Sequence, residues 1–375
     1  MKKIKVLSII GTRPEVVKMA PVLLEMKKHP ERIDSILAST AQHREMLDQV
    51  LKVFALKPDI DLNIMKPNQT LTHITVSALQ GIESLIQEIK PDIVLAQGDT
   101  TTVFAASLAA FYNKTLIGHV EAGLRSFDKY NPYPEEINRK LTDSLTDYFF
   151  APTSLAKSNL IKEGIPENKV FVTGNTVVDA LMHALTLPFS LNNVPELKNI
   201  PFNGEKILLV TAHRRENHDG PLSNICNALK ELEHSFNDLQ IIYPVHLNPA
   251  VRQTVYQMLG KTERIHLINP VDYLTFVHLM KNSYLILTDS GGVQEEAPSL
   301  GKPVLVMRKV TERPEAYEAG VAKIIGTEKE AIVREASALL TDNSLYASMS
   351  QVKNPYGDGK AGNRIVKIIL DEFLN

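Results

Sequence analysis

Three acidic segments in the first half of the chain carry side chains that can transfer protons. Asp99 lies in Gly-Asp-Thr-Thr-Thr, Glu121 in His-Val-Glu-Ala-Gly-Leu-Arg, and Glu135 with Glu136 in Pro-Tyr-Pro-Glu-Glu. Carboxylates held close together repel, which raises at least one pKa toward neutrality and makes that group a usable general acid or base. The structural alternative for Asp99 is a helix N-cap, a position that aspartate fills well.

A cationic segment near the start of the chain predicts an anion-binding site. In Gly-Thr-Arg-Pro-Glu, Thr12 and Glu15 fit the capping box that begins a helix. Arg13 does not fit that explanation, because a cation at the positive end of a helix is electrostatically unfavourable. An anion bound between Arg13 and the helix would remove the conflict, and Lys18 lies near the same helix end.

A second cationic segment lies in the other half of the chain. His213 is followed by Arg214 and Arg215, a combination suited to anion binding or proton transfer, whereas a lone loop histidine is usually only solvated. His213, His246 and His266 are far apart in the sequence and lack metal-ligand spacing. We therefore expect no metal site.

The run Asp-Ser-Gly-Gly-Val-Gln-Glu-Glu at 289–296 has the strongest signal for a nucleotide-sugar site. Ser290, Gly291 and Gly292 at a helix start leave backbone N–H groups open to a diphosphate. Glu296 lies one to two turns further on, on a face that can reach a ribose. The structural alternative is a tight strand-to-helix turn, which would need neither two glycines nor the acidic run.

Apolar runs that alternate with helical patterns must position these segments. Continuous apolar strands separated by helices are typical of parallel sheets covered on both faces, in a doubly wound arrangement. The expected strands are 6–10, 93–96, 116–120, 148–151, 207–211, 241–245, 285–288 and 304–307, and the expected helices are 15–28, 101–112, 138–145, 154–163, 225–236 and 361–373. Every chemical segment named above then lies at or near the carboxyl end of a strand, where open parallel sheets bind ligands.

The composition bounds the class of protein. The 375 residues are enough for about two domains, and the Pro- and Asn-rich stretch 187–204 suits a surface segment near a boundary. A hydrophobic content of 44% with 22% charged residues excludes a disordered, collagen-like or coiled-coil chain. The net charge of −2 leaves no electrostatic footprint for nucleic acid or an anionic membrane.

The cysteine count and the lengths of the apolar runs indicate where in the cell the protein works. Cys226 is the only cysteine, so an intrachain disulfide and a cysteine-based metal site are excluded, and its apolar neighbours predict a buried place on a helix. The longest uncharged stretch in an apolar region, 100–113, is shorter than the ~18–20 residues that span a bilayer. The N-terminus lacks a signal-peptide cleavage pattern. We expect a soluble, cytoplasmic protein.

Taken together, these segments resemble the non-hydrolysing UDP-N-acetylglucosamine 2-epimerases of bacteria. The matching segments run through the whole chain in order: 11–15, 40–44, 98–102, 119–125, 134–136, 173–176, 213–216, 243–249, 288–298, 311–315 and 354–359. The resemblance implies a GT-B fold, with two Rossmann-like doubly wound parallel-sheet domains and the active site in the cleft between them. It implies an N-terminal domain of residues 1–172 plus 359–375, which carries the acid/base groups, and a UDP-binding domain of residues 173–358.

The resemblance also implies a reaction. Such enzymes interconvert UDP-N-acetylglucosamine and UDP-N-acetylmannosamine by eliminating UDP across C-1 and C-2 to give 2-acetamidoglucal, followed by re-addition. The implied catalytic residues are Asp99, Glu121, Glu135 and His213. The implied substrate-binding residues are Arg13, Lys18, Phe276, Ser290, Gly291, Gly292, Glu296 and Arg313. The second Arg-Pro-Glu, at 313–315, would otherwise be explained by chance and by the preference of proline for a first helical turn.

Regulation and partners follow from the same resemblance. Many bacterial members are activated by a second UDP-N-acetylglucosamine, and the matching allosteric positions are Gln42, Gln69, Glu136, Arg214 and His246. A homodimer is expected, with no cofactor, no metal, no nucleic acid and no membrane partner, and the product would supply cell-surface polysaccharide synthesis. Three alternatives stay open: a GT-B glycosyltransferase that uses the same donor, a hydrolysing epimerase, and a UDP-sugar sensor without turnover. The length leaves no room for the kinase domain of the bifunctional hydrolysing enzymes.

Overall fold

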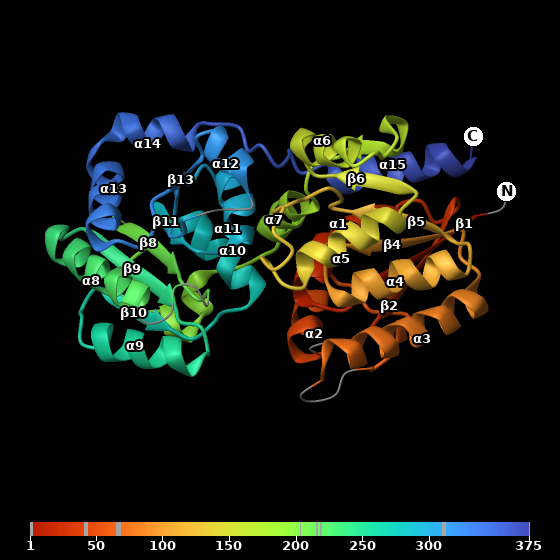
Figure 1. Ribbon diagram of the computed structural model, residues 1–375. Coiled ribbons are helices and arrows are strands. Elements are labelled where there is room, and N and C mark those ends of the chain that lie inside the picture. The colour runs from red at the N-terminus through yellow and green to blue at the C-terminus, as the bar shows by residue number, and fades with distance from the viewer. Residues whose placement is uncertain are drawn as a thin grey trace. The chain divides into compact units, whose positions relative to one another are not determined.

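The computed structural model describes residues 3–40, 44–64, 69–202, 204–214, 217, 220–309 and 313–374. The chain divides into two compact units, which we call unit 1 (Met1–Ala184 with Tyr356–Asn375) and unit 2 (Leu185–Pro355). These limits are limits of packing, and the functional boundaries expected from the sequence stay predictions. Figure 1 labels most of the helices and strands of both units.

Unit 1 is built on a seven-stranded parallel sheet with the order β3-β2-β1-β4-β5-β6-β7. Its strands are β1 (Ile4–Ile10), β2 (Ile33–Ser39), β3 (Ile60–Asp61), β4 (Ile93–Gln97), β5 (Leu116–Val120), β6 (Tyr148–Ala151) and β7 (Val170–Val172). The strand order reverses between β1 and β4, so the crevice beside their carboxyl ends is the topological switch point, where doubly wound sheets bind ligands.

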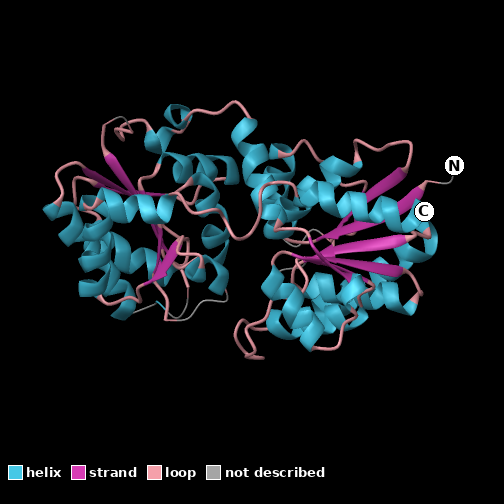
Figure 2. Ribbon diagram, turned by 90° about the horizontal axis from the view of Figure 1, so that it is seen from above, coloured by secondary structure: helices cyan, strands magenta, loops and turns pink. Residues whose placement is uncertain are grey.

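Helices cover both faces of this sheet (Figure 2). They are α1 (Arg13–Met26), α2 (Arg44–Val53), α3 (Leu71–Ile89), α4 (Thr101–Tyr112), α5 (Glu135–Leu145), α6 (Ser154–Lys162), α7 (Thr176–Thr186) and α15 (Ala361–Leu374), with the 3-10 turn η1 (Glu167–Lys169). The capping box predicted for α1 is present. The last helix, α15, packs against α1. Gly362 permits this contact, because a Cβ there would lie 2.9 Å from the carbonyl oxygen of Pro21.

Unit 2 repeats the plan with six parallel strands in the order β10-β9-β8-β11-β12-β13. The strands are β8 (Lys206–Thr211), β9 (Leu239–Pro244), β10 (Ile265–Ile268), β11 (Leu285–Thr288), β12 (Val304–Val306) and β13 (Ala322–Ile324). The helices are α8 (Gly220–Ser235), α9 (Pro249–Leu259), α10 (Tyr273–Asn282), α11 (Gly291–Glu296), α12 (Pro314–Glu318), α13 (Lys329–Thr341) and α14 (Asn343–Ser350), and the 3-10 turns are η2 (Leu191–Asn193), η3 (Pro195–Leu197) and η5 (Ala297–Leu300). The switch point of this sheet lies between β8 and β11.

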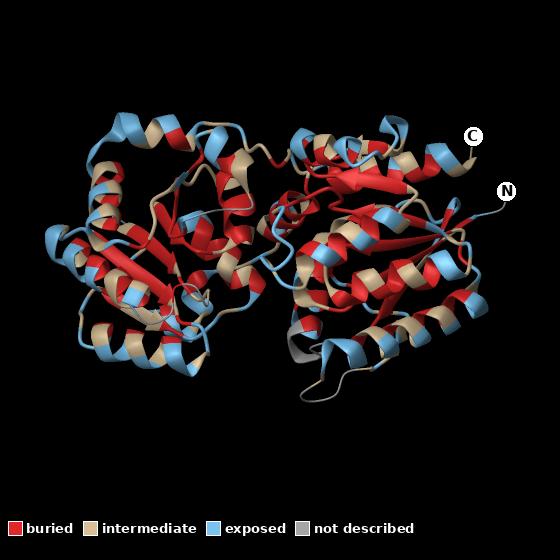
Figure 3. Ribbon diagram, in the orientation of Figure 1, coloured by how far each residue is buried: buried red, intermediate tan, exposed pale blue. Residues whose placement is uncertain are grey.

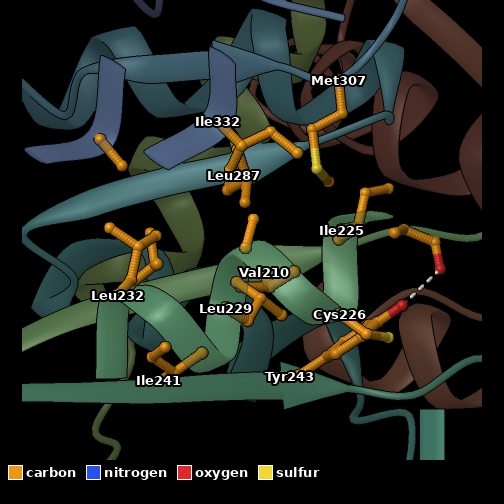
Figure 4. Packing of buried hydrophobic residues seen from close by; sticks show 14 of the residues in the cluster. Val210, Ile225, Cys226, Leu229, Leu232, Ile241, Tyr243, Leu287, Met307 and Ile332 are labelled. Carbon is orange, nitrogen blue, oxygen red and sulfur yellow. Dashed lines mark hydrogen bonds between the residues drawn. The ribbon is translucent and has the colours of Figure 1, made fainter. Parts of the chain in front are cut away.

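The core of unit 2 shows why its strands read as continuous apolar runs. Leu229 of α8, Tyr243 of β9 and Leu287 of β11 are fully buried in one cluster (Figure 4). The Tyr243 hydroxyl still finds a partner, since it donates to the carbonyl oxygen of Ala212 at 2.9 Å. Cys226 lies in the same cluster, and burial raises the pKa of its thiol to about 12. The prediction of a buried cysteine on a helix is therefore confirmed.

The central strands of both sheets are buried, whereas the helices are exposed along their outer faces (Figure 3). All eight strands and all six helices predicted from the sequence are present, with ends that differ by a few residues. Within the described part of the chain, no helix combines the length and the apolar character needed to cross a membrane.

Candidate active site

The loops that carry Asp99 and Glu121 meet at the carboxyl edge of the unit 1 sheet. β4 and β5 are paired in register, with Gln97 opposite Val120. Directly beyond this pair, the backbone N–H of Gly98 donates to the carbonyl oxygen of Val120 at 3.0 Å. The prediction that these two acidic loops lie together is therefore confirmed.

Asp99 is held by an arginine that the sequence interpretation did not single out. The guanidinium Nη2 of Arg139, on α5, lies 2.5 Å from Oδ2 of Asp99. Asn138 on the same helix donates to the backbone carbonyl of Asp99 at 3.0 Å. The N-cap of α4 is Thr100, whose hydroxyl accepts the N–H of Val103, so the interpretation of Asp99 as an N-cap is wrong. The Asp99 carboxylate instead pairs with Arg139 of α5, and 26% of the Asp99 side-chain surface is exposed.

Glu121 has an unusual backbone and a cationic partner. Its φ angle is +71°, in the left-handed region that non-glycine residues seldom adopt. Residues held in such conformations cluster at active sites. Lys18 of α1 places its Nζ 2.5 Å from Oε2 of Glu121. Lys18, expected near the substrate, is thereby brought to the acidic loops.

The two glutamates that open α5 have different surroundings. Glu135 is half-buried at the first position of the helix. Glu136 is 1% exposed, and its two oxygens accept the backbone N–H groups of Ser126 and Phe127 at 2.9 and 3.1 Å. Its Oε2 also lies 3.3 Å from Nη1 of Arg139. Glu136 thus shapes the loop before α5, and its assignment to an allosteric site stays a prediction.

A buried network of His119, Asp143 and Arg125 makes hydrogen bonds to the backbone of both acidic loops. His119 is fully buried, with Nδ1 2.7 Å from Oδ1 of Asp143 and Nε2 2.7 Å from the carbonyl oxygen of Gly98. Oδ2 of Asp143 accepts from Arg125 at 2.7 Å and from the backbone N–H of Gly123 at 3.3 Å. Burial tends to raise the pKa of Asp143, but His119 and Arg125 outweigh it and hold that pKa below its usual value. One carboxylate therefore ties together the segments before Asp99 and after Glu121.

Glu15 is a second buried carboxyl that the sequence interpretation used only as a cap residue. Its Oε2 accepts the N–H groups of Gly11 and Thr12, and its Oε1 accepts the hydroxyl of Thr100 at 2.6 Å. Burial raises its pKa to about 7, against the lowering effect of these hydrogen bonds. Glu15 thus joins the loop after β1 to the loop of Asp99. The only sequence signal for this was the capping-box spacing.

The remaining residues predicted in unit 1 lie around the same sheet or beyond the described residues. Arg13 is half-buried at the first position of α1. Gln69 lies before α3 and donates to the carbonyl oxygen of Ile64 at 3.0 Å. Gln42 falls outside the described residues.

The second group of predicted residues gathers at the switch point of unit 2. Thr211 and Thr288, the last residues of β8 and β11, are paired in register, and their hydroxyl oxygens lie 2.5 Å apart. The loop from Ala212 onward and the loop from Asp289 onward therefore leave the sheet side by side. The loop after β8 also reaches His246, because the His213 and His246 rings stack with centroids 5.5 Å apart and an interplanar angle of 20°.

Asp289 organises the loop that bears His213. Its Oδ2 accepts the backbone N–H of His213 at 2.7 Å and that of Arg214 at 2.8 Å, and its Oδ1 lies 3.1 Å from Nδ1 of His213. The guanidinium of Arg214 donates through Nε to the backbone carbonyl of Asp289 at 3.1 Å. Asp289 begins the 289–296 motif, but the sequence alone assigns it no role.

The Ser-Gly-Gly segment opens α11 as the sequence predicted. Ser290 is the N-cap residue, and a Cβ added at Gly292 would meet nothing closer than 3.9 Å, so the helix start is open. Glu296 ends the helix and accepts the hydroxyl of Tyr273 at 3.0 Å. Phe276, three residues after Tyr273 on α10, shares that side of the helix. The positions predicted for the diphosphate, the ribose and the uracil thus follow one another along this part of unit 2.

Arg313 lies at the N-cap of α12, and its Nε is 2.5 Å from Oε1 of the buried Glu295 on α11. This pair brings the second Arg-Pro-Glu segment to the Ser-Gly-Gly helix. The acidic run after the two glycines therefore includes an anchor for the arginine, a function that its composition alone did not reveal.

Comparisons with known proteins agree with this arrangement. A family model described as UDP-N-acetylglucosamine 2-epimerase matches residues 24–370. The chain is 54% identical to the UDP-N-acetylglucosamine 2-epimerase of Bacillus subtilis over 376 aligned residues, with 100% of this chain and 97% of that protein covered. It is 51% identical to the enzyme of the same name from Escherichia coli, with 99% and 100% covered. The crystal structure of UDP-GlcNAc 2-epimerase from Neisseria meningitidis bound to UDP-GlcNAc superposes with a TM-score of 0.90 at 50% identity, covering 98% of this chain and 100% of that one.

Proposed function

Because the chain belongs to the UDP-N-acetylglucosamine 2-epimerase family, we propose that it interconverts UDP-N-acetylglucosamine and UDP-N-acetylmannosamine by inverting C-2. The observation that carries the proposal within the structure is the convergence of the Asp99 and Glu121 loops, with the cationic partners Arg139 and Lys18, at the carboxyl ends of β4 and β5. The match to the family extends through both units, with GT-B-type neighbours over the whole length.

The proposed reaction proceeds by elimination and re-addition. A base removes the proton from C-2, the C-1–oxygen bond to UDP breaks, and the electron pair of the C-2–hydrogen bond becomes the double bond of 2-acetamidoglucal. UDP leaves with the electron pair of the broken bond. In the reverse sense, an acid protonates C-2 on the other face and a UDP oxygen bonds again to C-1. No electrons are gained or lost overall, so no redox partner is required.

Unit 1 is proposed to supply the acid and the base. Asp99, Glu121 and Glu135 are the candidates, since each lies in a loop or helix start at the edge of one sheet. A carboxyl partner on each face of C-2 satisfies the requirement for deprotonation on one side and protonation on the other. Lys18, paired with Glu121, is positioned to hold that carboxylate in a fixed direction.

Unit 2 is proposed to bind UDP. Ser290, Gly291 and Gly292 would receive the diphosphate at the start of α11, where backbone N–H groups favour anions. Arg313 and His213 would neutralise its charge, Glu296 would bind the ribose, and Phe276 would lie against the uracil. Arg13 on unit 1 is proposed to contact the same nucleotide sugar.

The setting of the reaction is part of the proposal. We expect a cytoplasmic homodimer, activated by a second molecule of UDP-N-acetylglucosamine through Gln42, Gln69, Glu136, Arg214 and His246. The product would supply N-acetylmannosamine units to cell-surface polysaccharide synthesis.

Incubation with UDP-N-acetylglucosamine in heavy water tests the reaction directly. Epimerisation through C-2 deprotonation places deuterium at C-2 of both nucleotide sugars, which proton NMR detects as loss of the C-2 signal. Retention of hydrogen at C-2 would overturn the proposal. Transfer of the sugar to an acceptor would indicate a glycosyltransferase, accumulation of free UDP and free sugar a hydrolysing enzyme, and binding without isotope exchange a sensor.

A further inference from the structure

We propose that Asp289 is a positioning residue that fixes the ring of His213 with its proton on Nδ1, so that Nε2 is the nitrogen that acts on the substrate. The inference deepens the proposed function, because it rests on the role of His213 beside the diphosphate. It concerns a side chain that the family resemblance left without a role.

The carboxylate of Asp289 is built into the loop of His213. It is fully buried directly after β11. Its Oδ2 accepts three N–H groups, from the backbone of His213 and Arg214 at 2.7 and 2.8 Å and from Nδ2 of Asn217 at 3.0 Å. Its Oδ1 faces the His213 ring, 3.1 Å from Nδ1. One oxygen therefore fixes the backbone of the loop, and the other faces the imidazole.

The approach of Oδ1 to the ring favours one position of the ring proton. An ionised carboxylate only accepts hydrogen bonds, so an Nδ1 atom that hydrogen-bonds to it must be the donor. In a neutral imidazole, the other nitrogen, Nε2, then carries the lone pair. The His213 side chain is 39% exposed, and its Nε2 lies on the edge of the ring opposite Nδ1.

The charge state of Asp289 is consistent with this role. Burial tends to raise its pKa, but the hydrogen bond and charge of His213, with the backbone N–H groups of Arg214 and His213, outweigh burial and lower that pKa. Asp289 is therefore ionised at neutral pH.

In the proposed reaction, His213 would then act on the leaving group. When the C-1–oxygen bond breaks, negative charge develops on the diphosphate. An imidazolium whose Nδ1 is held by Asp289 offers its Nε2–H to that oxygen, and the neutral ring takes the proton back on re-addition. The ring of His246 stacks on the face of His213, whereas Asp289 approaches the His213 ring at its edge, at Nδ1.

The substitution Asp289→Asn tests this assignment with little change in shape. The amide oxygen can take the place of Oδ2 and accept the same three N–H groups, so the loop keeps its hydrogen bonds. The amide nitrogen then faces Nδ1 of His213, which must become an acceptor, and the proton moves to Nε2. We expect kcat to fall at least ~10²-fold, the scale for a misdirected acid/base group, with a much smaller change in KM.

A spectroscopic measurement distinguishes a role of Asp289 in orienting the His213 ring from a role in holding the loop backbone alone. At a pH where the His213 ring is neutral, its nitrogen-15 shifts, identified by their absence in His213→Gln, should place the proton on Nδ1 in the unaltered enzyme and on Nε2 in Asp289→Asn. The comparison variant is Asn217→Ala, which removes another partner of Asp289 Oδ2 without touching the His213 ring. It should loosen the loop and leave the proton on Nδ1.

Two results would overturn the inference. One is a neutral His213 ring that carries its proton on Nε2 in the unaltered enzyme. The other is an Asp289→Asn variant that keeps its activity or loses it without any movement of the proton. Failure of the proposed function is distinguished by the heavy-water experiment, because the nitrogen-15 measurement needs no turnover.

Discussion

Lys18 and Glu121 form an ion pair between α1 and the loop after β5, with Nζ 2.5 Å from Oε2. The two residues are separated by 103 positions in the chain. Their side chains are 12% and 7% exposed, so the pair is largely shielded from solvent. The lysine thereby fixes the direction of a carboxylate whose backbone is already held in the left-handed region.

The acid/base assignment predicts a sharp loss of turnover on neutralising either carboxylate. Asp99→Asn and Glu121→Gln should each reduce kcat by at least ~10²-fold, the contribution of a general acid or base, with little loss of UDP affinity. Turnover is measured by NMR of the two nucleotide sugars and UDP affinity by calorimetry. Asp371→Asn, an exposed carboxylate on α15, is the control and should change neither. Near-native rates in both active-site variants would refute the assignment.

Arg313→Ala should act mainly on UDP binding. Removing a charge-assisted hydrogen bond to the diphosphate costs about 1.5–3 kcal/mol, or about 10-fold or more in Kd. The matched control is Arg334→Ala, since Arg334 pairs with Glu335 on the exposed face of α13. Titration calorimetry with UDP compares the two, and thermal melting checks the effect of leaving Glu295 unpaired. Equal UDP affinity in all three proteins would contradict the clamp.

Glu15 should make the stability of unit 1 depend on pH. Burial raises its pKa to about 7 in the folded protein from an ordinary value of 4.5, so the folded state binds more protons than the unfolded state between these limits. Stability therefore falls as pH rises from about 4.5 to about 7, by about 3 kcal/mol at most, and levels off above. Glu15→Gln can keep the hydrogen bonds to Gly11 and Thr12 and should remove this dependence.

The check for Glu15 is urea unfolding of both proteins at several pH values between 5 and 8. The quantity of interest is the difference in unfolding free energy between Glu15→Gln and the unaltered chain. That difference should shift in favour of the glutamine variant as pH rises. A difference that is flat across the range would show that Glu15 is not protonated in the folded state.

The network around Arg125 predicts unequal roles for its two carboxylates. Asp143 is buried between Arg125 and His119, whereas the Glu163 side chain is 35% exposed. Asp143→Asn should destabilise the protein by about 3–5 kcal/mol, because it leaves buried charge uncompensated. Glu163→Gln should cost less, about 1–2 kcal/mol, because the Glu163 carboxylate is partly exposed although it makes two hydrogen bonds to the buried Arg125. Denaturant unfolding of the two variants under one set of conditions measures both, and similar losses would contradict the buried role of Asp143.

Two glycines of the acidic loops have similar backbones and different surroundings. Gly98 has φ +84° with nothing within 4 Å of an added Cβ, whereas Gly123 has φ +86° and its Cβ would lie 2.3 Å from the carbonyl oxygen of Ala156. Gly98→Ala should cost about 1–2 kcal/mol from backbone strain alone. Gly123→Ala should cost clearly more, because α6 must also move. Unfolding free energies of equal size would argue against the close approach of α6.

Much of the fold followed from local pattern. The buried strands with continuous apolar runs, such as β4 and β11, were predicted within a residue, because burial on both faces leaves that mark in the sequence. β2 was not predicted, since exposed and half-buried residues follow its first one and break the apolar run. β3 has two residues, too few for any periodicity.

The residues of the candidate site were also predictable from the sequence only in part. Residue types and their positions after strands were enough to select Asp99, Glu121, His213 and the Ser-Gly-Gly segment, since parallel strands end at one edge of a sheet. The resemblance to a family added roles for them. Neither revealed their partners.

Those partners depend on which strands and helices become neighbours. Arg139 reaches Asp99 across 40 positions and Asp289 reaches His213 across 76, through contacts made by α5 and by the pairing of β8 with β11. The capping residue of α4 turned out to be Thr100, which left Asp99 available to pair with Arg139. Local periodicity determines strands, helices and the loops between them. Strand order and helix packing, which arise only when distant segments bury surface together, determined the charge partners of each chemical group.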